Sequence, residues 1–251
     1  MHTIRNYIMA ESLEQAWELN QKGRNNIIIG GNLWLKMGRR NIINAIDLSS
    51  LGLDKIEEDE GGFRIGCMAT LHDIETHEGL NKEFQNLFKE AVRHIVGVQF
   101  RNCATIGGSI FPKLGFSDVL TAFLACDTQV ILYKKGEVPL REFIYIPTDN
   151  DILTHLYVKK DGRKTAYESF RMTETDFPTI TCAMAKTQDG FETVLGARPK
   201  HAEVVVDEVV ADAFSSEEVS DYAKRVIGKL QYGSNIRGSE QYRKQLSKVL
   251  I

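Results

Sequence analysis

The chain has 251 residues, of which 43% are hydrophobic and 26% charged, and its formal net charge is -3. This balance is typical of a soluble globular protein and excludes an intrinsically disordered chain, which needs low hydrophobicity and high net charge. Because acidic and basic residues are mixed, with no basic tail or stripe, the composition also argues against nucleic acid or an anionic membrane as a partner.

The sequence shows neither a targeting segment nor a membrane segment. Its first residues lack the apolar core of a signal peptide, and no apolar run approaches the ~20 residues that cross a bilayer. We therefore expect a cytoplasmic protein. The four cysteines (Cys67, Cys103, Cys126, Cys182) have no CxxC spacing, so we expect reduced, mostly buried thiols, no metal site and no iron–sulfur cluster in this chain.

The amino-terminal part of the sequence alternates helix and strand patterns. Residues 12–20 have helical periodicity, and the β-branched run 27–29 predicts a buried strand that ends in Gly30-Gly31. Further strands are predicted at 42–48, 55–58 and 63–65. Thr70 marks the start of a helix, and residues 83–95 have the pattern of a second amphipathic helix.

The rest of the sequence mixes strands and helices in an irregular order. Gly107-Gly108 follows an apolar stretch, and Ser117-Asp118 precedes an apolar helix at 119–124. Further strands are predicted at 129–132, 152–158, 166–170, 179–184 and 192–195. The polar stretch 159–164 is the expected domain boundary. Because the order is not a regular βαβ rhythm, the pattern predicts an α+β fold.

Two amphipathic helices are predicted after the last strand. Ser215 caps the first, with Glu218 three residues later. The expected buried stripe of this helix is Val219, Ala223, Ile227 and Leu230. The apolar residues of the last helix are Tyr242, Leu246, Val249 and Leu250. These spacings place each stripe on one helix face, as expected of amphipathic helices.

Two glycine pairs, Gly30-Gly31 and Gly107-Gly108, each follow a short apolar stretch. Glycine permits a sharp turn and a close approach of a ligand, and successive free N–H groups form a concavity that suits a pyrophosphate. Two such loops could hold one pyrophosphate from both sides, although an ordinary tight turn explains either pair on its own. Gly61-Gly62 has acidic neighbours and is interpreted as a hairpin turn.

Signatures of other sites are missing. There is no GxGxxG between a strand and a helix, which leaves a Rossmann NAD site unsupported, and there is no GxxxxGK[ST]. The six histidines are scattered; His72 and His77 are five residues apart, not the three or four that share a helix face. No nucleophile–base motif occurs. The residues alone therefore predict neither a catalytic side chain nor a metal site.

Several segments resemble those of one known family. Residues 98–109, VQFRNCATIGGS, resemble the QIRNxATIGGN signature of the FAD subunits of molybdenum hydroxylases, such as xanthine dehydrogenase, aerobic carbon monoxide dehydrogenase and nicotinate dehydrogenase. Residues 28–33, IIGGNL, are similar to the family's AGGTDL loop, and residues 237–243, RGSEQYR, to its closing RGSxxYR signature. Family segments are also matched by IDL at 46–48, IGCMATL at 65–71 and SD at 117–118.

This resemblance covers nearly the whole chain and implies an α+β fold in two domains. Residues 1–160 would form a two-part FAD-binding domain of the vanillyl-alcohol-oxidase-like (PCMH) type, with subdomains at about 1–54 and 55–160. Residues 163–251 would form a small α+β C-terminal domain of the carbon monoxide dehydrogenase flavoprotein type. This boundary agrees with the polar stretch identified above.

The resemblance also implies an FAD, and because neither glycine loop contains a His or Cys, apart from Cys103 at the edge of one, we expect it to be bound non-covalently. Matched by position, its contacts would be Ile27, Ile28, Ile29, Gly30, Gly31, Asn32, Leu33, Trp34, Thr105, Ile106, Gly107, Gly108, Ser109, Asp118, Leu153 and Arg171. Asn32 and Leu33 replace a polar pair found in many relatives, Ser109 replaces the usual Asn, and the C-terminal domain is short. Because such loops act through backbone N–H groups, these departures are compatible with FAD but put the tuning of its potential in question.

The implied function is electron transfer without side-chain catalysis. In the family, a molybdenum cofactor on one partner subunit hydroxylates the substrate, iron–sulfur clusters on a second subunit carry the electrons, and the flavin passes them to NAD⁺ or another acceptor. The first expectation is therefore the FAD subunit of a xanthine dehydrogenase-type hydroxylase. The alternatives are an FAD electron-transfer subunit of a different redox complex and a flavin-free scaffold with the same fold.

Overall fold

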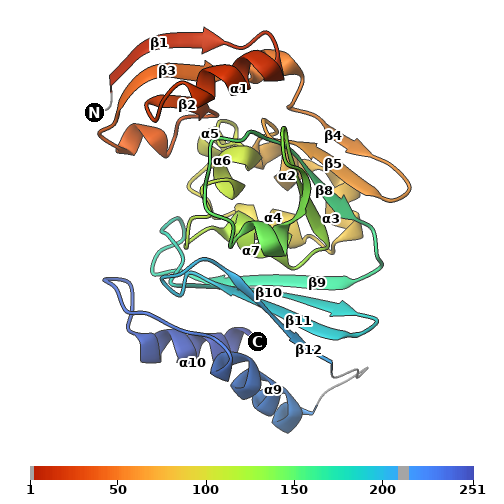
Figure 1. The fold of residues 1–251 in the computed structure, drawn as a ribbon. Coiled ribbons are helices and arrows are strands. Elements are labelled where there is room, and N and C mark those ends of the chain that lie inside the picture. The colour runs from red at the N-terminus through yellow and green to blue at the C-terminus, as the bar shows by residue number, and fades with distance from the viewer. Residues whose placement is uncertain (1–2, 209–214) are drawn as a thin grey trace.

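The computed structural model describes residues 3–208 and 215–251, which contain three sheets arranged one after another along the molecule (Figure 1). A three-stranded sheet with helix α1 lies at one end. A five-stranded sheet and several short helices form the middle, and a four-stranded sheet with two longer helices forms the other end. This mixture of helices and separate sheets confirms the expected α+β class.

The amino-terminal sheet is parallel and has the order β1-β3-β2. Its strands are β1 (Thr3–Met9), β3 (Asn41–Asp47) and β2 (Asn26–Ile29). Parallel strands need long connections, and α1 (Leu13–Gln21), capped by the Ser12 side chain, supplies the first. The second, residues 30–40, contains only the 3-10 helix η1 (Leu35–Met37). Strand β2 therefore leads directly into a mostly irregular loop at Gly30.

The middle part is built on an antiparallel sheet of order β4-β5-β8-β6-β7. Its strands are β4 (Ile56–Glu58), β5 (Gly62–Gly66), β8 (Leu153–Lys159), β6 (Thr128–Leu132) and β7 (Gly136–Pro139). Its helices are η2 (Ser49–Leu51), α2 (Leu71–Thr76), α3 (Glu78–Glu83), α4 (Leu87–Val92), α5 (Val98–Arg101), α6 (Ile106–Ile110), α7 (Asp118–Leu124) and α8 (Leu140–Phe143). Every residue of α7 is buried, as its almost entirely apolar sequence requires.

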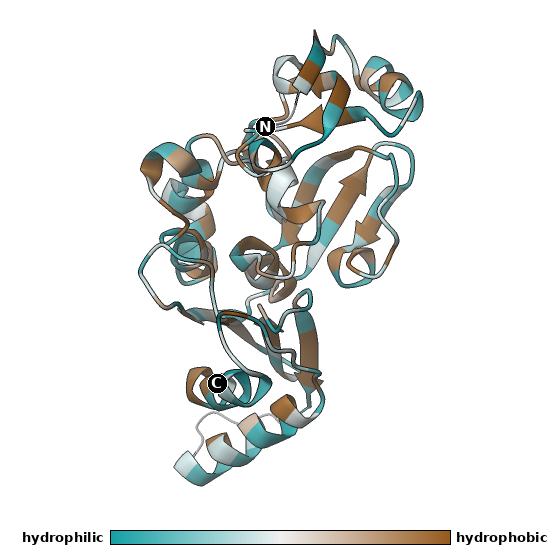
Figure 2. Ribbon diagram, turned by 90° about the vertical axis from the view of Figure 1, so that its left-hand side faces the viewer, coloured by the Kyte–Doolittle hydropathy of each residue, from teal (hydrophilic) through white to brown (hydrophobic). Residues whose placement is uncertain are grey.

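The carboxy-terminal sheet is antiparallel and has the order β12-β11-β10-β9. Its strands are β9 (Lys164–Phe170), β10 (Ile180–Thr187), β11 (Gly190–Gly196) and β12 (Glu203–Asp207). Helices α9 (Ser216–Gly228) and α10 (Glu240–Leu250) pack on it from one side, and α4 and α7 from the middle part (Figure 1). Strands β10 and β11 carry most of the apolar, buried residues of this sheet, whereas hydrophilic residues predominate on the exposed turns of α9 (Figure 2). The link between β8 and β9 falls at the predicted domain boundary, but the division into domains stays a prediction.

The pattern at 83–95 does not form the single helix that its periodicity predicts. Helix α3 ends at Glu83 and α4 begins at Leu87, because Gln85 and Asn86 between them have positive φ angles of 47° and 64°. A left-handed backbone does not continue a right-handed helix. The Asn81 side chain joins the pieces, since its amide donates to the Ile74 carbonyl and its Oδ1 accepts from the Lys89 N–H.

The two C-terminal helices confirm only part of the predicted apolar stripes: Ala223 and Leu230 are buried, and Ile227, Leu246 and Leu250 pack partly buried against the same cluster. In α9 the capping box of Ser215 and Glu218 is confirmed, but the residues buried within the helix are Tyr222, Ala223 and Val226, and Val219 is exposed. In α10 Arg243 and Ser247 are buried, while Tyr242 and Val249 are exposed. Arg243 is buried in α10 because its guanidinium donates to four backbone carbonyls, those of Thr179, Ala197, Gly233 and Gly238.

Candidate functional site

The two predicted glycine segments lie against each other. A β-carbon added to Gly31 would stand 1.7 Å from the carbonyl oxygen of Cys103, and one added to Gly30 would stand 2.4 Å from the Thr105 Oγ1. Any other residue at either position would therefore collide with the neighbouring segment. Neither glycine has a positive φ angle, so the close approach, and not backbone conformation, explains why glycine is needed here.

The segment around Gly107-Gly108 is not the turn that its sequence predicts. The two glycines lie inside helix α6, where Thr105 is the N-cap and its Oγ1 accepts from the Gly108 N–H at 3.2 Å. The Gly107 N–H donates to the Cys67 carbonyl at 2.8 Å, and the amides of Ile106 and Ser109 also donate to backbone carbonyls. These N–H groups are engaged within the protein, so this segment buttresses the first glycine loop instead of forming a second concavity.

The loop after β2 does have free donors. Within the described residues, the backbone N–H groups of residues 31–34 have no hydrogen-bond partner. Asn32 has a positive φ of 58°, a conformation that asparagine tolerates better than most residues and one that helps successive N–H groups converge on an anion. The Asn32 Oδ1 is also buried without a partner. Of the two predicted phosphate-binding loops, this one has the geometry for it.

An aromatic cluster of Trp34, Phe116 and Phe177 lies beside this loop. Trp34 belongs to the loop itself, Phe116 precedes helix α7, and Phe177 lies between β9 and β10. Their ring centroids are 5.1 Å (Trp34–Phe116), 5.8 Å (Trp34–Phe177) and 4.6 Å (Phe116–Phe177) apart. Trp34 and Phe177 are 49% and 40% exposed, so the cluster joins three parts of the chain and opens at the surface.

A buried carboxylate lies next to the cluster in sequence. Asp118, the first residue of α7, accepts hydrogen bonds from the Tyr167 hydroxyl at 2.5 Å and from the Arg171 guanidinium. Burial raises the pKa of Asp118, and the positive charge of Arg171 opposes that rise. Burial and the nearby Asp118 raise the pKa of Tyr167 well above its ordinary range, which keeps its hydroxyl protonated as a donor. The structure thus brings together two of the predicted residues, Asp118 and Arg171.

A second arginine extends this arrangement. Arg171 donates to the Asp176 carbonyl at 2.6 Å, and the Asp176 carboxylate accepts from Arg237 at 3.0 Å. The hydrogen bond from Arg237 lowers the pKa of Asp176. The Arg237 guanidinium also lies 5.0 Å from the centre of the Phe177 ring. The Nε atoms of Arg171 and Arg237 are both buried and have no partner in the described part of the chain, so each arginine has a donor to spare.

Sequence reasoning did not assign four of these residues. Phe116, Tyr167, Asp176 and Phe177 lie outside the quoted motifs, although Phe116 directly precedes the SD pair. Arg237 opens the RGSEQYR segment but had no assigned role. Among the predicted contacts, Leu153 is a core residue of β8 that shares the main hydrophobic cluster with Ile106 and Ile110 of α6. Ile29 is buried in a small cluster against Ile42 and Ala45.

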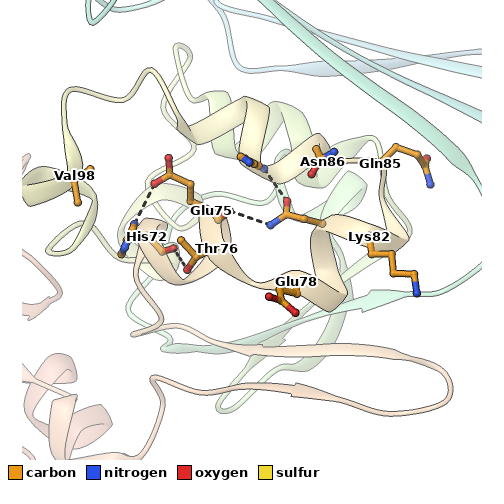
Figure 3. Close-up of a pocket in the computed structure, with 10 residues that line it drawn as sticks. His72, Glu75, Thr76, Glu78, Lys82, Gln85, Asn86 and Val98 are labelled. Atoms are coloured by element: carbon orange, nitrogen blue, oxygen red, sulfur yellow. Dashed lines mark hydrogen bonds and ion pairs between the residues drawn. The ribbon is translucent and has the colours of Figure 1, made fainter.

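A separate hollow of about 590 Å³ lies over helices α2, α3 and α4 (Figure 3). The residues that line it are mostly of polar types and include His72, Glu75 and Lys82. Figure 3 shows the Glu75 side chain turned toward His72, whose Nδ1 is 3.2 Å from the carboxylate. Because Arg101 also binds Glu75, this carboxylate is fully engaged and gives the hollow no free acid or base. The candidate site is therefore the junction around the aromatic cluster.

The described residues also limit what else the chain holds. No group of three His, Cys, Asp or Glu side chains among residues 3–208 and 215–251 could bind a metal ion. Within the same ranges, no helix is long and apolar enough to span a bilayer. All four cysteines are free; Cys67, Cys126 and Cys182 are buried and Cys103 is exposed.

Comparison with known proteins gives a consistent result. The family model described as "FAD binding domain in molybdopterin dehydrogenase" matches residues 2–158. The glyceraldehyde dehydrogenase medium chain of Sulfolobus acidocaldarius is 26% identical over 266 residues, which is 97% of this chain and 94% of that protein. Among solved structures, carbon monoxide dehydrogenase of Hydrogenophaga pseudoflava superposes with a TM-score of 0.86 at 22% identity and covers 98% of this chain and 93% of its own. Quinoline 2-oxidoreductase of Pseudomonas putida 86 has a TM-score of 0.87 at 18% identity, with 98% and 93% coverage.

Proposed function

The chain belongs to the family of FAD-binding domains of molybdopterin dehydrogenases, and we propose that it is the electron-transfer subunit of a molybdenum hydroxylase complex. In this role it receives electrons from iron–sulfur clusters on one partner subunit while a molybdenum cofactor on another oxidises the substrate. The observation that carries the proposal is the convergence of separate family segments on one junction: the loop at 31–34, the SD pair at Asp118, and Arg237 of the closing signature.

The side chains at the junction fit a flavin dinucleotide. The four unbonded N–H groups of residues 31–34 suit a pyrophosphate, and segment 103–109 holds their loop in place. The aromatic cluster offers faces for a flat ring, and the spare Nε–H groups of Arg171 and Arg237 offer donors to ring carbonyls. When bound, FAD supplies the redox chemistry; the chain orients it and sets its electrostatic surroundings. We assign these contacts to a non-covalent FAD, with residues 105–109 and the core residue Leu153 supporting the site from within the protein.

The partners and acceptor follow from the same assignment. The "6-hydroxypseudooxynicotine dehydrogenase complex subunit alpha" of Paenarthrobacter nicotinovorans, 24% identical over 98% of this chain, is by name part of a complex. We propose a cytoplasmic complex with an iron–sulfur subunit and a molybdenum subunit, of the xanthine dehydrogenase type, with NAD⁺ as the acceptor. Because the sequence has no Rossmann signature, NAD⁺ would bind weakly at the flavin itself.

The first experiment tests the cofactor. The purified chain is expected to be yellow, with one FAD per chain, and acid precipitation is expected to release the flavin into solution. Flavin that stays with the precipitate would contradict non-covalent attachment. A colourless chain that takes up no FAD on dialysis would favour the flavin-free scaffold.

The second experiment tests the partners. The chain is purified alone and with its co-expressed partner subunits, and NADH is added to the lone chain while flavin absorbance is followed. Bleaching of the flavin by NADH supports NAD⁺ as the acceptor. NADH formation from NAD⁺ and a purine by the complex, but not by the lone chain, supports the hydroxylase assignment. Purine oxidation by the lone chain would overturn the electron-transfer role. A partner without molybdenum would favour a different redox complex.

A further inference from the structure

We propose that Arg237 sets the reduction potential of the bound flavin, and that Asp176 and Phe177 are positioning residues that hold its guanidinium for this purpose. The inference rests on the proposed function, because it concerns the same site. It goes beyond that function in naming a residue of the C-terminal region, outside the predicted flavin contacts, as the source of the electrostatic control.

Arg237 is held in place from three directions. Its Nη2 donates to the Asp176 carboxylate at 3.0 Å, and its guanidinium lies 5.0 Å from the centre of the Phe177 ring. Its own N–H donates to the Asn235 Oδ1 at 2.9 Å. The preceding Ile236 is 95% exposed. The Ile236 side chain therefore lies in solvent, whereas the Arg237 side chain is held at the junction.

The turn that carries Arg237 is itself braced. Asn235 and Gly238 exchange two backbone hydrogen bonds of 3.1 Å each. The buried Arg243 donates to the Asn235 Oδ1 at 2.6 Å and to the carbonyl of Gly238. Because the turn is constrained, the Arg237 guanidinium needs little reorganisation when a ligand binds. A charge that is already in place can control the potential of the ligand beside it.

The chemistry of the junction indicates which part of a flavin would meet Arg237. Among the described residues, the buried nitrogen donors without a partner are the Nε–H groups of Arg171 and Arg237. A flavin has carbonyl acceptors on its pyrimidine ring and none on its dimethylbenzene ring, so the pyrimidine ring is the part that satisfies these donors. Reduction adds negative charge to that ring. A guanidinium beside it therefore favours the reduced over the oxidised cofactor.

The two arginines are not equivalent. Arg171 is 7% exposed and its charge is matched by the buried Asp118, so its removal would disturb the core. Arg237 is 28% exposed and is matched by Asp176, a carboxylate that is 30% exposed. Substitution at 237 or 176 thus changes the charge at the mouth of the site with little cost to packing. Neutralising Arg237 removes a positive charge from the site, whereas neutralising Asp176 removes a negative charge.

The experiment compares FAD binding by the full chain under oxidising conditions and after reduction with dithionite. Arg237→Gln is expected to lower the preference for reduced over oxidised FAD about tenfold, which is a potential about 30 mV more negative for a two-electron couple. Asp176→Asn, which leaves Arg237 unopposed, is expected to move the potential in the positive direction. Arg237→Lys, which keeps the charge, is expected to stay closer to the wild type than Arg237→Gln.

A matched control lies elsewhere in the chain. Arg225 also pairs with a carboxylate, that of Asp207 at 3.1 Å, and lies 5.7 Å from the ring of Tyr222, but on helix α9. Arg225→Gln is expected to leave both FAD affinities unchanged. If Arg237→Gln weakens the binding of oxidised and reduced FAD to the same extent, or changes neither affinity, Arg237 has only a structural role and the inference is overturned. A wild-type chain that binds no FAD at all would instead overturn the proposed function.

Discussion

Glu75 holds the guanidinium of Arg101 with both carboxylate oxygens, at 2.8 Å to Nε and 2.9 Å to Nη2. The pair ties helix α2 to α5, and α5 leads directly into the Cys103–Thr105 stretch that supports the first glycine loop. Arg101 also donates to the Ile95 carbonyl and its side chain is only 7% exposed. An arginine of the quoted signature thus has a structural role behind the candidate site.

Replacing Glu75 with Gln is expected to destabilise the fold by about 3 kcal/mol, because it leaves a buried guanidinium without its counter-charge. Urea unfolding monitored by circular dichroism measures the change. The matched control is Glu58→Gln, whose ion pair with Lys160 is more exposed and is expected to contribute less than about 1 kcal/mol. Equal effects of the two substitutions would contradict the role given to Glu75.

The same pair predicts a pH dependence. Burial raises the pKa of Glu75, but hydrogen bonds from Arg101 and His72 outweigh burial and hold it below its ordinary value of 4.5. A carboxylate with a lowered pKa stabilises the folded state above its unfolded pKa and loses that contribution as the pH falls through the folded value. The melting temperature of the wild type is therefore expected to fall more steeply below about pH 4.5 than that of Glu75→Gln. Parallel pH profiles would rule this out.

Asp118→Asn is expected to weaken the junction without a change of size. Asn keeps an acceptor for the Tyr167 hydroxyl but leaves Arg171, which is 7% exposed, without its carboxylate. The expected loss of stability is about 3 kcal/mol, with loss of FAD occupancy at dilute cofactor. Thermal unfolding measures this loss of stability. The control is Asp221→Asn, because the ion pair between Asp221 and Lys224 is exposed. A wild-type melting temperature in Asp118→Asn would show that the pair adds nothing.

The cysteines predict a simple chemical pattern. Cys103 is exposed, whereas burial raises the pKa of both Cys67 and Cys182 to about 12 and also raises that of Cys126. Because the thiolate is the reactive form, iodoacetamide at pH 8 is expected to label one thiol per native chain and four in urea. Mass spectrometry of peptides identifies the site. Rapid native labelling of a second cysteine would mean that the core opens more readily than its burial indicates.

The sequence predicted the elements with strong local signals and missed those whose pattern depends on distant contacts. The capping boxes at Thr70 and Ser215 need only neighbouring residues, and both are confirmed. Strand β1 was not predicted, because nearly all of its residues are exposed and show no alternation of burial.

The candidate site shows the same division. The glycine loop and the SD pair were readable from motifs, whereas Phe177 and Asp176 join the site only because the loop between β9 and β10 folds back onto Trp34 and Arg237. No local pattern encodes that contact. The amides of Ile106 and Gly107 were misread for a related reason: their acceptors, the Ala69 and Cys67 carbonyls, come from a segment about 40 residues earlier in the chain.

Gly31→Ala tests the contact between the two glycine segments. The added β-carbon would meet the Cys103 carbonyl oxygen at 1.7 Å, and because that oxygen is backbone, either segment must shift. Overpacking of this kind costs about 1–3 kcal/mol, or a few degrees of melting temperature per kcal/mol in a chain of this size. A shift of the loop would also displace the free N–H groups at 31–34, so FAD occupancy is expected to fall as well.

The control is Gly23→Ala, which adds the same methyl group where no atom lies within 4 Å and φ is not positive. It is expected to leave both melting temperature and FAD occupancy unchanged. Gly31→Ala that keeps its stability but loses FAD would mean that the ligand, and not Cys103, needs the space beside Gly31. Gly31→Ala with wild-type values of both would show that the contact is not present in solution.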